Sequence, residues 1–266
     1  MKVFIKIFTL IILSQSVESC SLLSAAGLSS QGQPVKKVSE NLNSLETIII
    51  DHSDWDQLLK KHVNSEGLVD YKGFLEDRNV LQEYLKMLSK NPPSESWSVQ
   101  ELLAYYSNIY NAATIELILE NYPVNSIKDI NGAWTKAIVT VGDKTLSLGG
   151  IENGILRKMN EPRIHFAINC ASFSCPNLLN EAFTADKIDS QLDKVTRNFI
   201  NGPKNEIGIT SVTLSKIFDW YKKDYVINGK NDVIGFVNSY LNKKIKINPK
   251  ATITYFEYDW GLNEQK

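Results

Sequence analysis

The sequence of 266 residues predicts an α+β fold, a single mixed domain that is rich in helices and has short antiparallel strands. Two observations support this prediction. Segments with apolar residues at helical spacing outweigh segments with the alternation of a strand. The strand-like segments also lack the regular alternation with helices that a parallel sheet requires. The globular domain is expected to span residues 46–266, which is long enough to bury a substantial core.

The first half of this domain is predicted to be helical. One helix is expected to begin at Ser53, a second to cover 80–88, and the longest to run over 101–121. Ser98 and Glu101 have the spacing of a capping box, which fixes the start of the longest helix.

The second half is predicted to mix short strands with helices. Residues 137–141 and 144–148 flank Gly142-Asp143, a typical two-residue hairpin turn. A short helix is expected over 150–159 and a strand over 164–169. The remaining predicted elements are helices over 184–200, 215–225 and 232–241, and strands over 207–214, 244–247 and 253–256.

Charge and cysteine content narrow the classes of function. The chain carries 29 basic and 30 acidic side chains, with a net charge of -1. No excess of positive charge exists to displace counterions from a phosphate backbone, so we predict no nucleic-acid partner. The three cysteines are Cys20, which follows the apolar N-terminal run, and Cys170 and Cys175, which lie close together in the globular domain.

The N-terminus has the pattern of a lipoprotein signal peptide, predicted over residues 1–19. Basic residues precede an apolar run over 7–13, and the small residue Ser19 stands directly before Cys20. We expect Cys20 to carry a lipid, and residues 20–45 to include a flexible tether rich in small and polar residues. The expected location is the cell envelope, as a periplasmic or outer-membrane lipoprotein whose anchor contacts the lipid membrane. The alternative is an ordinary cleaved signal with an incidental Cys.

The segment 163–176 concentrates the side chains that could perform chemistry. A Cys nucleophile needs a nearby base to form its thiolate and a third polar group to orient that base. His165 is the candidate base, and either Cys170 or Cys175 is the candidate nucleophile. The candidate orienting groups are Asn169 and Glu152.

The same two cysteines have a structural interpretation. In an exported protein, two Cys five residues apart are often a disulfide that closes a small loop, which would remove both Cys170 and Cys175 as nucleophiles. A zinc site is disfavoured because these two Cys and His165 give three ligands without an obvious fourth. We therefore predict no metal and no cofactor.

A second polar cluster lies on the longest predicted helix. Asn108 and Asn111 are three residues apart, so they share one face of it. Two inward-facing amides must find hydrogen-bond partners, which are either a substrate or a neighbouring loop. Arg157, in the same predicted short helix as Glu152, is a further candidate binding residue.

Taken together, these motifs resemble the family catalogued as domain of unknown function 547, found in exported bacterial proteins and in plants. The similarity runs from Trp55 to Asn263 and departs from the family pattern at Tyr106-Ser107, where Trp-Ile is usual, and at Ala171, where Gly is common. The resemblance implies that the polar groups of the two clusters meet in one pocket. The motifs that carry it are Asn108-x-Tyr110-Asn111, Leu148-x-x-Ile151-Glu152-x-x-Ile155-Leu156-Arg157, Pro162-Arg163-x-His165-Phe166-Ala167-x-Asn169-Cys170-x-Ser172-x-Ser174-Cys175-Pro176 and Tyr258-Asp259-Trp260-x-Leu262-Asn263.

Two functions follow as expectations. The first is a thiol-dependent hydrolase or transferase of amides or thioesters, in which Asn108 or Asn111 donates to the oxyanion. The second is a non-catalytic binding module whose recognition loop is shaped by a Cys170–Cys175 disulfide. In either case the ligand is a small molecule or a peptide that the sequence does not identify.

Overall fold

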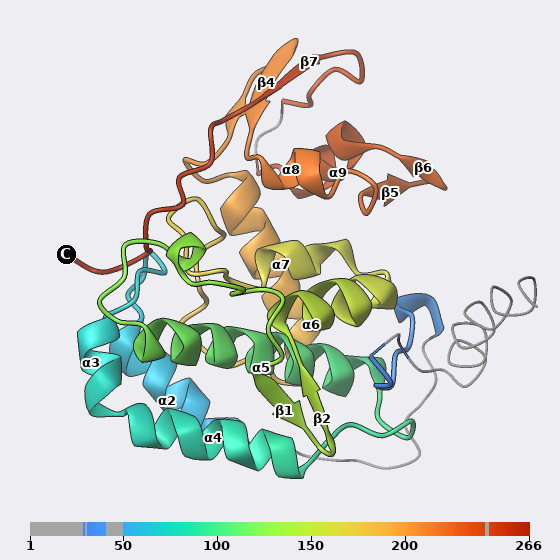
Figure 1. The fold of residues 1–266 in the computed structure, drawn as a ribbon. Helices are drawn as coiled ribbons and strands as arrows, with labels where there is room; N and C mark the ends of the chain where they lie inside the picture. Colours follow the sequence, from blue (N-terminus) through green and yellow to red (C-terminus); the bar gives the residue numbers. More distant parts are fainter. Residues whose placement is uncertain (1–28, 30, 41–49, 243–244) are drawn as a thin grey trace, which may run out of the picture.

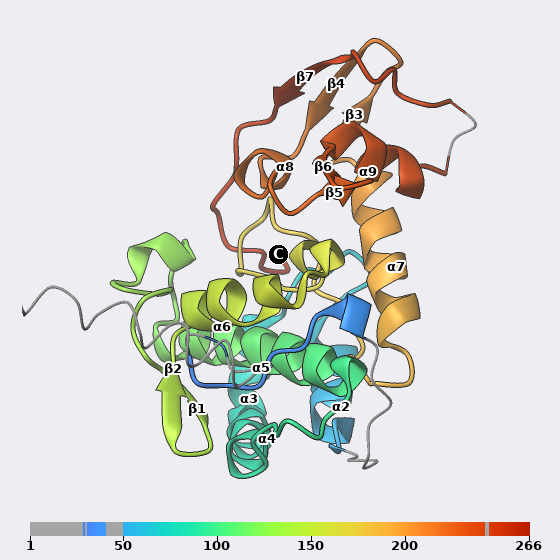
Figure 2. The ribbon, with the colours of Figure 1, turned by 90° about the vertical axis from the view of Figure 1, so that its right-hand side faces the viewer.

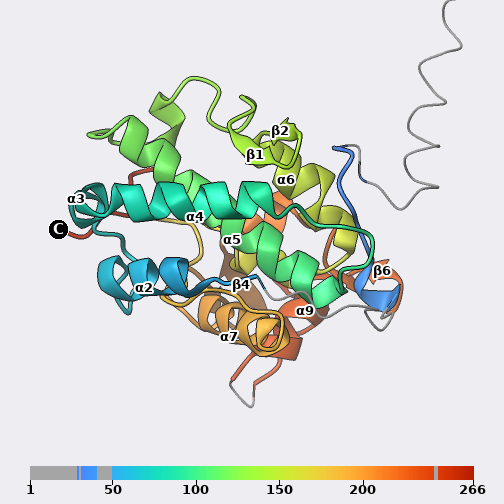
Figure 3. The same ribbon diagram turned by 90° about the horizontal axis from the view of Figure 1, so that it is seen from below.

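The N-terminal half of the domain is a layer of α-helices. The computed structural model describes residues 29, 31–40, 50–242 and 245–266. After a short 3₁₀ helix, η1 (Val38–Glu40), the layer contains α2 (Ser53–His62), α3 (Tyr71–Glu76), α4 (Arg78–Lys90) and α5 (Val99–Glu120). α4 packs along α5, and α2 packs against α4, as the view from below shows (Figure 3).

Helix α5 is the centre of the domain (Figure 1). The predicted capping box is present: the Ser98 side chain accepts the N–H of Glu101, and the Glu101 carboxylate accepts the N–H of Ser98. Nearly all side chains from Val99 to Leu119 are buried, including the polar Asn108 and Asn111. A helix that is buried on all sides is a core element rather than a surface helix.

The chain after α5 forms the second part of the domain. The helical elements of this part are η2 (Ile127–Asp129), α6 (Leu148–Gly154), η3 (Leu156–Met159), η4 (Pro162–Phe166), α7 (Ile188–Ile200), α8 (Ile217–Trp220) and α9 (Val233–Tyr240). α6 and α7 both contact α5, and α7 also contacts α9. Figure 2 shows α7 joining the helical layer to the C-terminal region, which contains α8 and α9.

In the part of the chain that the structure describes, the strands are short and form three separate sheets. Two are antiparallel hairpins: β1 with β2, and β5 with β6. In the third, β4 pairs antiparallel with β3 and parallel with β7. The strand bounds are β1 (Val139–Val141), β2 (Lys144–Leu146), β3 (Glu206–Ile207), β4 (Ser211–Leu214), β5 (Val226–Ile227), β6 (Lys230–Asn231) and β7 (Thr252–Tyr255).

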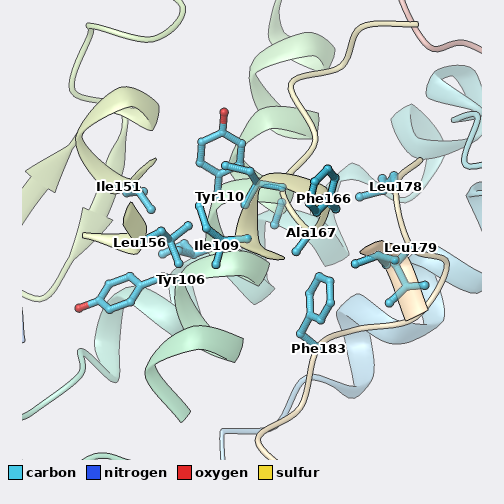
Figure 4. Close-up of a cluster of buried hydrophobic side chains, with 14 of the residues drawn as sticks. Tyr106, Ile109, Tyr110, Ile151, Leu156, Phe166, Ala167, Leu178, Leu179 and Phe183 are labelled. Carbon is cyan, nitrogen blue, oxygen red and sulfur yellow. The ribbon is translucent and has the colours of Figure 1, made fainter. Parts of the chain in front are cut away.

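One buried cluster connects α5 to the segments that carry the candidate chemistry (Figure 4). Its side chains come from α5, from α6 and η3, and from η4 and the stretch that joins it to α7. The burial of apolar side chains is the main source of stability for a domain of this kind. The labelled members are Tyr106, Ile109, Tyr110, Ile151, Leu156, Phe166, Ala167, Leu178, Leu179 and Phe183, and all of them are buried.

The predicted fold class is confirmed, because the domain is rich in helices and most of its strand pairs are antiparallel. The prediction of a strand over 164–169 is wrong. Residues Pro162–Phe166 form the 3₁₀ helix η4 instead. Pro162 stands at its first position, and the Glu161 side chain caps it by accepting the N–H of Arg163. These local signals for a helix outweigh the apolar residues that suggested a strand.

Other predicted elements are shorter in the structure. The predicted helix over 150–159 begins at Leu148 and changes to 3₁₀ geometry after Gly154, and the predicted helix over 215–225 is reduced to α8. The predicted strand over 207–214 is divided into β3 and β4 by a turn, and residues 245–247 form no strand.

The predicted signal peptide over 1–19 and Cys20 lie outside the described residues. Within the described ranges, no helix combines the length and the apolar character needed to span a bilayer.

Candidate functional site

One cavity brings together side chains that are far apart in the sequence. Its volume is about 340 Å³, and it is lined by Tyr110 of α5, Glu152 of α6 and Ile217 of α8. It therefore lies where the helical layer meets the C-terminal region. The lining side chains with acid, base or nucleophilic groups are Glu152, His165, Cys170, Cys175, Tyr221 and Tyr258.

Two buried asparagines fix the backbone of the loop that carries both cysteines. Asn111 on α5 donates to the Ala167 carbonyl at 3.0 Å and accepts the Asn169 N–H at 2.8 Å. The Asn169 side chain in turn donates to the Pro176 carbonyl at 2.7 Å and accepts the Ala171 N–H at 2.8 Å. The loop is thus tied both to α5 and to itself.

The two thiols are free and adjacent, with 3.2 Å between the sulfur atoms. The Cys170 Sγ also lies 3.1 Å from the Ser172 hydroxyl and 3.5 Å from the Tyr258 hydroxyl. The hydrogen bond from the Cys175 thiol, with those from Ser172 and Tyr258, stabilises a thiolate at Cys170. Against the opposing effect of burial, these bonds lower the pKa of Cys170 to about 7.

Cys175 has the opposite character. Its side chain is buried, and both burial and the neighbouring Cys170 raise its pKa well above the ordinary value. Its sulfur also accepts the Cys170 N–H at 3.1 Å. Cys170 is partly exposed, so it is the thiol that ionises first, while Cys175 stays protonated and donates to it.

His165 is held by a carboxylate from a distant part of the chain. Its Nε2 lies 2.8 Å from Asp224 Oδ2, and its ring stacks on Tyr221 with 3.9 Å between centroids. Burial lowers the pKa of His165 despite the opposing effect of Asp224, so the imidazole is neutral at neutral pH. A carboxylate is an acceptor, so Nε2 carries the hydrogen and Nδ1 holds a lone pair. Among the described residues, this buried Nδ1 has no hydrogen-bond partner.

Asp224 is shared between His165 and Arg157. The Arg157 guanidinium donates from Nε at 2.6 Å and from Nη2 at 2.9 Å, a two-point contact to both carboxylate oxygens. Although burial raises it, these hydrogen bonds from His165 and Arg157 hold the pKa of Asp224 well below its usual range. Asp224 is therefore an anion fixed in position at the Nε2 edge of the imidazole.

Glu152 contributes a second, separate carboxylate. It is 7 % exposed and accepts hydrogen bonds from the hydroxyls of Tyr221 and Tyr110, the latter at 3.4 Å. Burial and the charge of Glu152 raise the pKa of Tyr221, which keeps this phenol protonated and donating.

Part of the cavity wall is aromatic. Trp134, Trp220, Tyr258 and Trp260 line it. The Trp260 ring centroid lies 4.6 Å from that of Tyr258 and 5.8 Å from that of Trp220. Trp220 remains 44 % exposed, so this wall extends to the molecular surface.

A family model described as "Protein of unknown function, DUF547" matches residues 94–200, the stretch that contains the cysteine loop, His165 and Glu152. Over these residues the chain is similar to the DUF547 family. No curated protein and no solved structure matches it. The DUF547 match covers both thiols and ends before Asp224 and the aromatic residues of the C-terminal region.

The cavity is lined by four of the predicted catalytic residues: Cys170, Cys175, His165 and Glu152. The structure brings neither Glu152 nor Asn169 to His165 as its orienting group, because Asp224 occupies that place and Asn169 shapes the loop. No three His, Cys, Asp or Glu side chains of the described part of the chain form a cluster that could hold a metal ion.

The predicted binding residues lie behind the cavity wall. Asn108 donates to the Phe183 carbonyl at 2.8 Å and accepts the Phe183 N–H at 3.0 Å, so its amide is fully engaged. Asn111 is engaged in the same way with the cysteine loop. Both asparagines therefore follow the loop-capping alternative. Arg157 acts on the site through Asp224.

The backbone conformation of Ala171 accounts for the Gly that is common at this position in the DUF547 pattern. Its φ is 59°, in the left-handed region where a Cβ atom is crowded and Gly is favoured. The family preference for Gly therefore matches the turn that the backbone makes between the two cysteines.

Asp224 and Tyr221 were missed in the sequence analysis. Both fall within the predicted helix over 215–225, where a charged residue and an aromatic residue are unremarkable, and their contacts to His165 span more than fifty positions. Tyr258 lay within a motif of the family resemblance, and that was the one signal for it.

Proposed function

We propose that this protein is a thiol-dependent hydrolase or acyl transferase that acts on an amide or thioester. The observation that carries the proposal is the contrast between two adjacent thiols. Cys170 is partly exposed in the cavity with a pKa lowered to about 7, whereas Cys175 is buried with a raised pKa. A partly exposed thiol that ionises near neutral pH is the state that a nucleophilic Cys needs.

In the proposed first step, the Cys170 thiolate attacks the carbonyl carbon of the substrate. A carbon–sulfur bond forms, and the bond to the leaving amine or thiolate breaks. A thiolate leaves without a proton, whereas an amine must be protonated as it leaves. For an amide substrate, His165 carries the proton of the Cys170 thiol to that amine.

In the second step, water or another acceptor attacks the acyl carbon on Cys170, the carbon–sulfur bond breaks, and the Cys170 thiolate is released. The neutral His165 takes the proton of the attacking molecule, and the fixed anion Asp224 stabilises the imidazolium that forms. In the acyl thioester the Cys170 sulfur is neutral. The Ser172 and Tyr258 hydroxyls, which donate to that sulfur, are then free to stabilise the oxyanion.

Trapping of the acyl-enzyme tests this proposal. After brief incubation with p-nitrophenyl acetate and acid quenching, mass spectrometry should find an acetyl group on the peptide that contains Cys170. The label should be lost in Cys170→Ser and retained in Cys175→Ser. An acetyl group located elsewhere, or equal labelling of the Cys170→Ser protein, would contradict the proposed nucleophile.

The second candidate is a non-catalytic binding module with a Cys170–Cys175 disulfide. The 3.2 Å between the two sulfurs favours it, because little movement would allow the bond to form. The two candidates differ in the state of the thiols after purification without reductant.

We further propose that the protein is anchored in the cell envelope through a lipid on Cys20, in the periplasm or at the outer membrane. The support is the order of basic, apolar and small-polar segments before this Cys. The anchor would keep the cavity near a membrane while the globular domain stays in water.

Replacing Cys20 by Ser should move the protein from the membrane fraction to the soluble fraction. The reason is that the lipid chains would supply the membrane affinity. Fractionation followed by immunoblotting measures this, with Cys170→Ser as the matched control that stays with the membrane. Unchanged membrane association of the Cys20→Ser protein would refute lipidation at that residue.

A further inference from the structure

The Glu152 carboxylate offers hydrogen-bond acceptors to the cavity. Glu152 is buried and lines the cavity, and its two oxygens each accept one hydrogen bond from a tyrosine. A carboxylate oxygen has room for a second donor. Each oxygen of Glu152 therefore retains acceptor capacity.

Across residues 50–242 and 245–266 as the structure describes them, no Lys or Arg forms an ion pair with Glu152. The charge of Glu152 contributes to raising the pKa of Arg157, but the Arg157 guanidinium donates its hydrogen bonds to both oxygens of Asp224. A buried anion without a paired cation is costly, and a cationic ligand would remove that cost.

His165 adds a second acceptor beside the cavity. Its Nε2 donates to Asp224, which leaves Nδ1 as a lone pair without a partner in the described residues. The residue lines the same cavity as Glu152 and is nine-tenths buried or more. An unsatisfied buried acceptor of this kind is rare in native structures.

The aromatic wall provides the other half of a cation site. The faces of Trp and Tyr rings attract cations that lie within about 6 Å of the ring centroid. Trp260 already shows this behaviour, because the ammonium of Lys128 lies 5.3 Å from its ring centroid. Lys128 is not part of the cavity lining, so Trp220 and Tyr258 remain available to a ligand.

We propose that the cavity binds a primary alkylammonium group, with its nitrogen against Glu152 and the adjacent methylenes, which share the positive charge, against the aromatic wall formed by Trp220, Tyr258 and Trp260. The proposal concerns the same cavity as the proposed function and adds the chemical class of the ligand. A substrate or acyl acceptor would then carry an amine close to its reacting carbonyl or nucleophile.

A primary ammonium fits better than a quaternary one. Glu152 has lone pairs to fill and the His165 Nδ1 has no partner among the described residues, and a primary ammonium offers such acceptors three charged N–H donors. A quaternary ammonium has no donor, so it would gain from the rings alone.

Binding of n-butylammonium to the wild-type protein tests the proposal. No acyl donor is present, so thiol chemistry is not involved, and failure of acyl trapping would leave this result intact. Calorimetry and the quenching of tryptophan fluorescence should give a dissociation constant at least about tenfold lower for n-butylammonium than for n-butanol. Tetramethylammonium should bind more weakly than n-butylammonium. Equal binding of the amine and the alcohol, or tighter binding of tetramethylammonium, would overturn the proposal.

Two variants locate the site. Glu152→Gln keeps the side-chain shape and should weaken n-butylammonium binding about tenfold, with little effect on n-butanol. Glu257→Gln is the matched control, because it removes the same charge from an exposed residue that does not line this cavity. Equal binding by both variants would overturn the role of Glu152. Should Glu152→Gln fail to fold, the comparison of amine with alcohol on the wild type still decides the proposal.

Discussion

Replacing Cys170 by Ser is expected to lower the rate of p-nitrophenyl acetate hydrolysis at pH 7 by about 10³-fold or more. A serine hydroxyl is not ionised at this pH, and the proposed base makes no direct hydrogen bond with the side chain at this position. Steady-state rates on folded protein, verified by near-UV circular dichroism, measure the effect.

Cys175→Ser is the matched control for this prediction. Its hydroxyl replaces the thiol whose hydrogen bond lowers the pKa of Cys170, so the rate is expected to fall by no more than about tenfold. Equal losses in the two variants would mean that the pair acts as a structural unit, and no loss in Cys170→Ser would exclude it as the nucleophile.

Replacing Asp224 by Asn should lower the same rate by about 10² to 10⁴-fold. The amide has nearly the shape of the carboxylate, but it lacks the negative charge that orients His165 and stabilises its imidazolium. The change also removes an interaction that opposes the lowering of the His165 pKa by burial, so the imidazole becomes a weaker base.

Asp219→Asn provides the comparison for Asp224→Asn. Asp219 lies in α8, pairs with Lys216 and Lys222, and does not line the cavity. Its replacement should leave the rate within about twofold, since surface ion pairs contribute little. Similar rates in the two variants would show that Asp224 serves only the folded structure. A thermal melt of both proteins separates lost stability from lost chemistry.

The sequence predicted those parts of the fold and site that depend on neighbours in the chain. The capping box at Ser98 and the hairpin turn at Gly142-Asp143 need only a few adjacent residues, and both are present. His165, Cys170 and Cys175, which the sequence concentrates in one short segment, line the same cavity.

Features that depend on distant residues could not be predicted in this way. The choice of Asp224 as the partner of His165, and of Tyr258 as a donor to Cys170, follows from how the C-terminal region packs onto the helical layer. The parallel pairing of β4 with β7 has the same origin. For Asn108 and Asn111, spacing alone left two uses open, and only the position of the loops distinguishes them.

The central claim is that Cys170 is a free thiol that ionises near neutral pH, and its alkylation by iodoacetamide as a function of pH tests this most directly. The protein should be purified from its native compartment without reductant, and both cysteine-containing sites should be followed by mass spectrometry. The expected result is a free Cys170 whose alkylation rate rises with a midpoint at about pH 7, because the lowered pKa leaves the thiolate populated above that pH, while Cys175 reacts slowly. A quantitative Cys170–Cys175 disulfide, or a midpoint at the ordinary thiol value of about 8.5, would contradict the proposed enzyme.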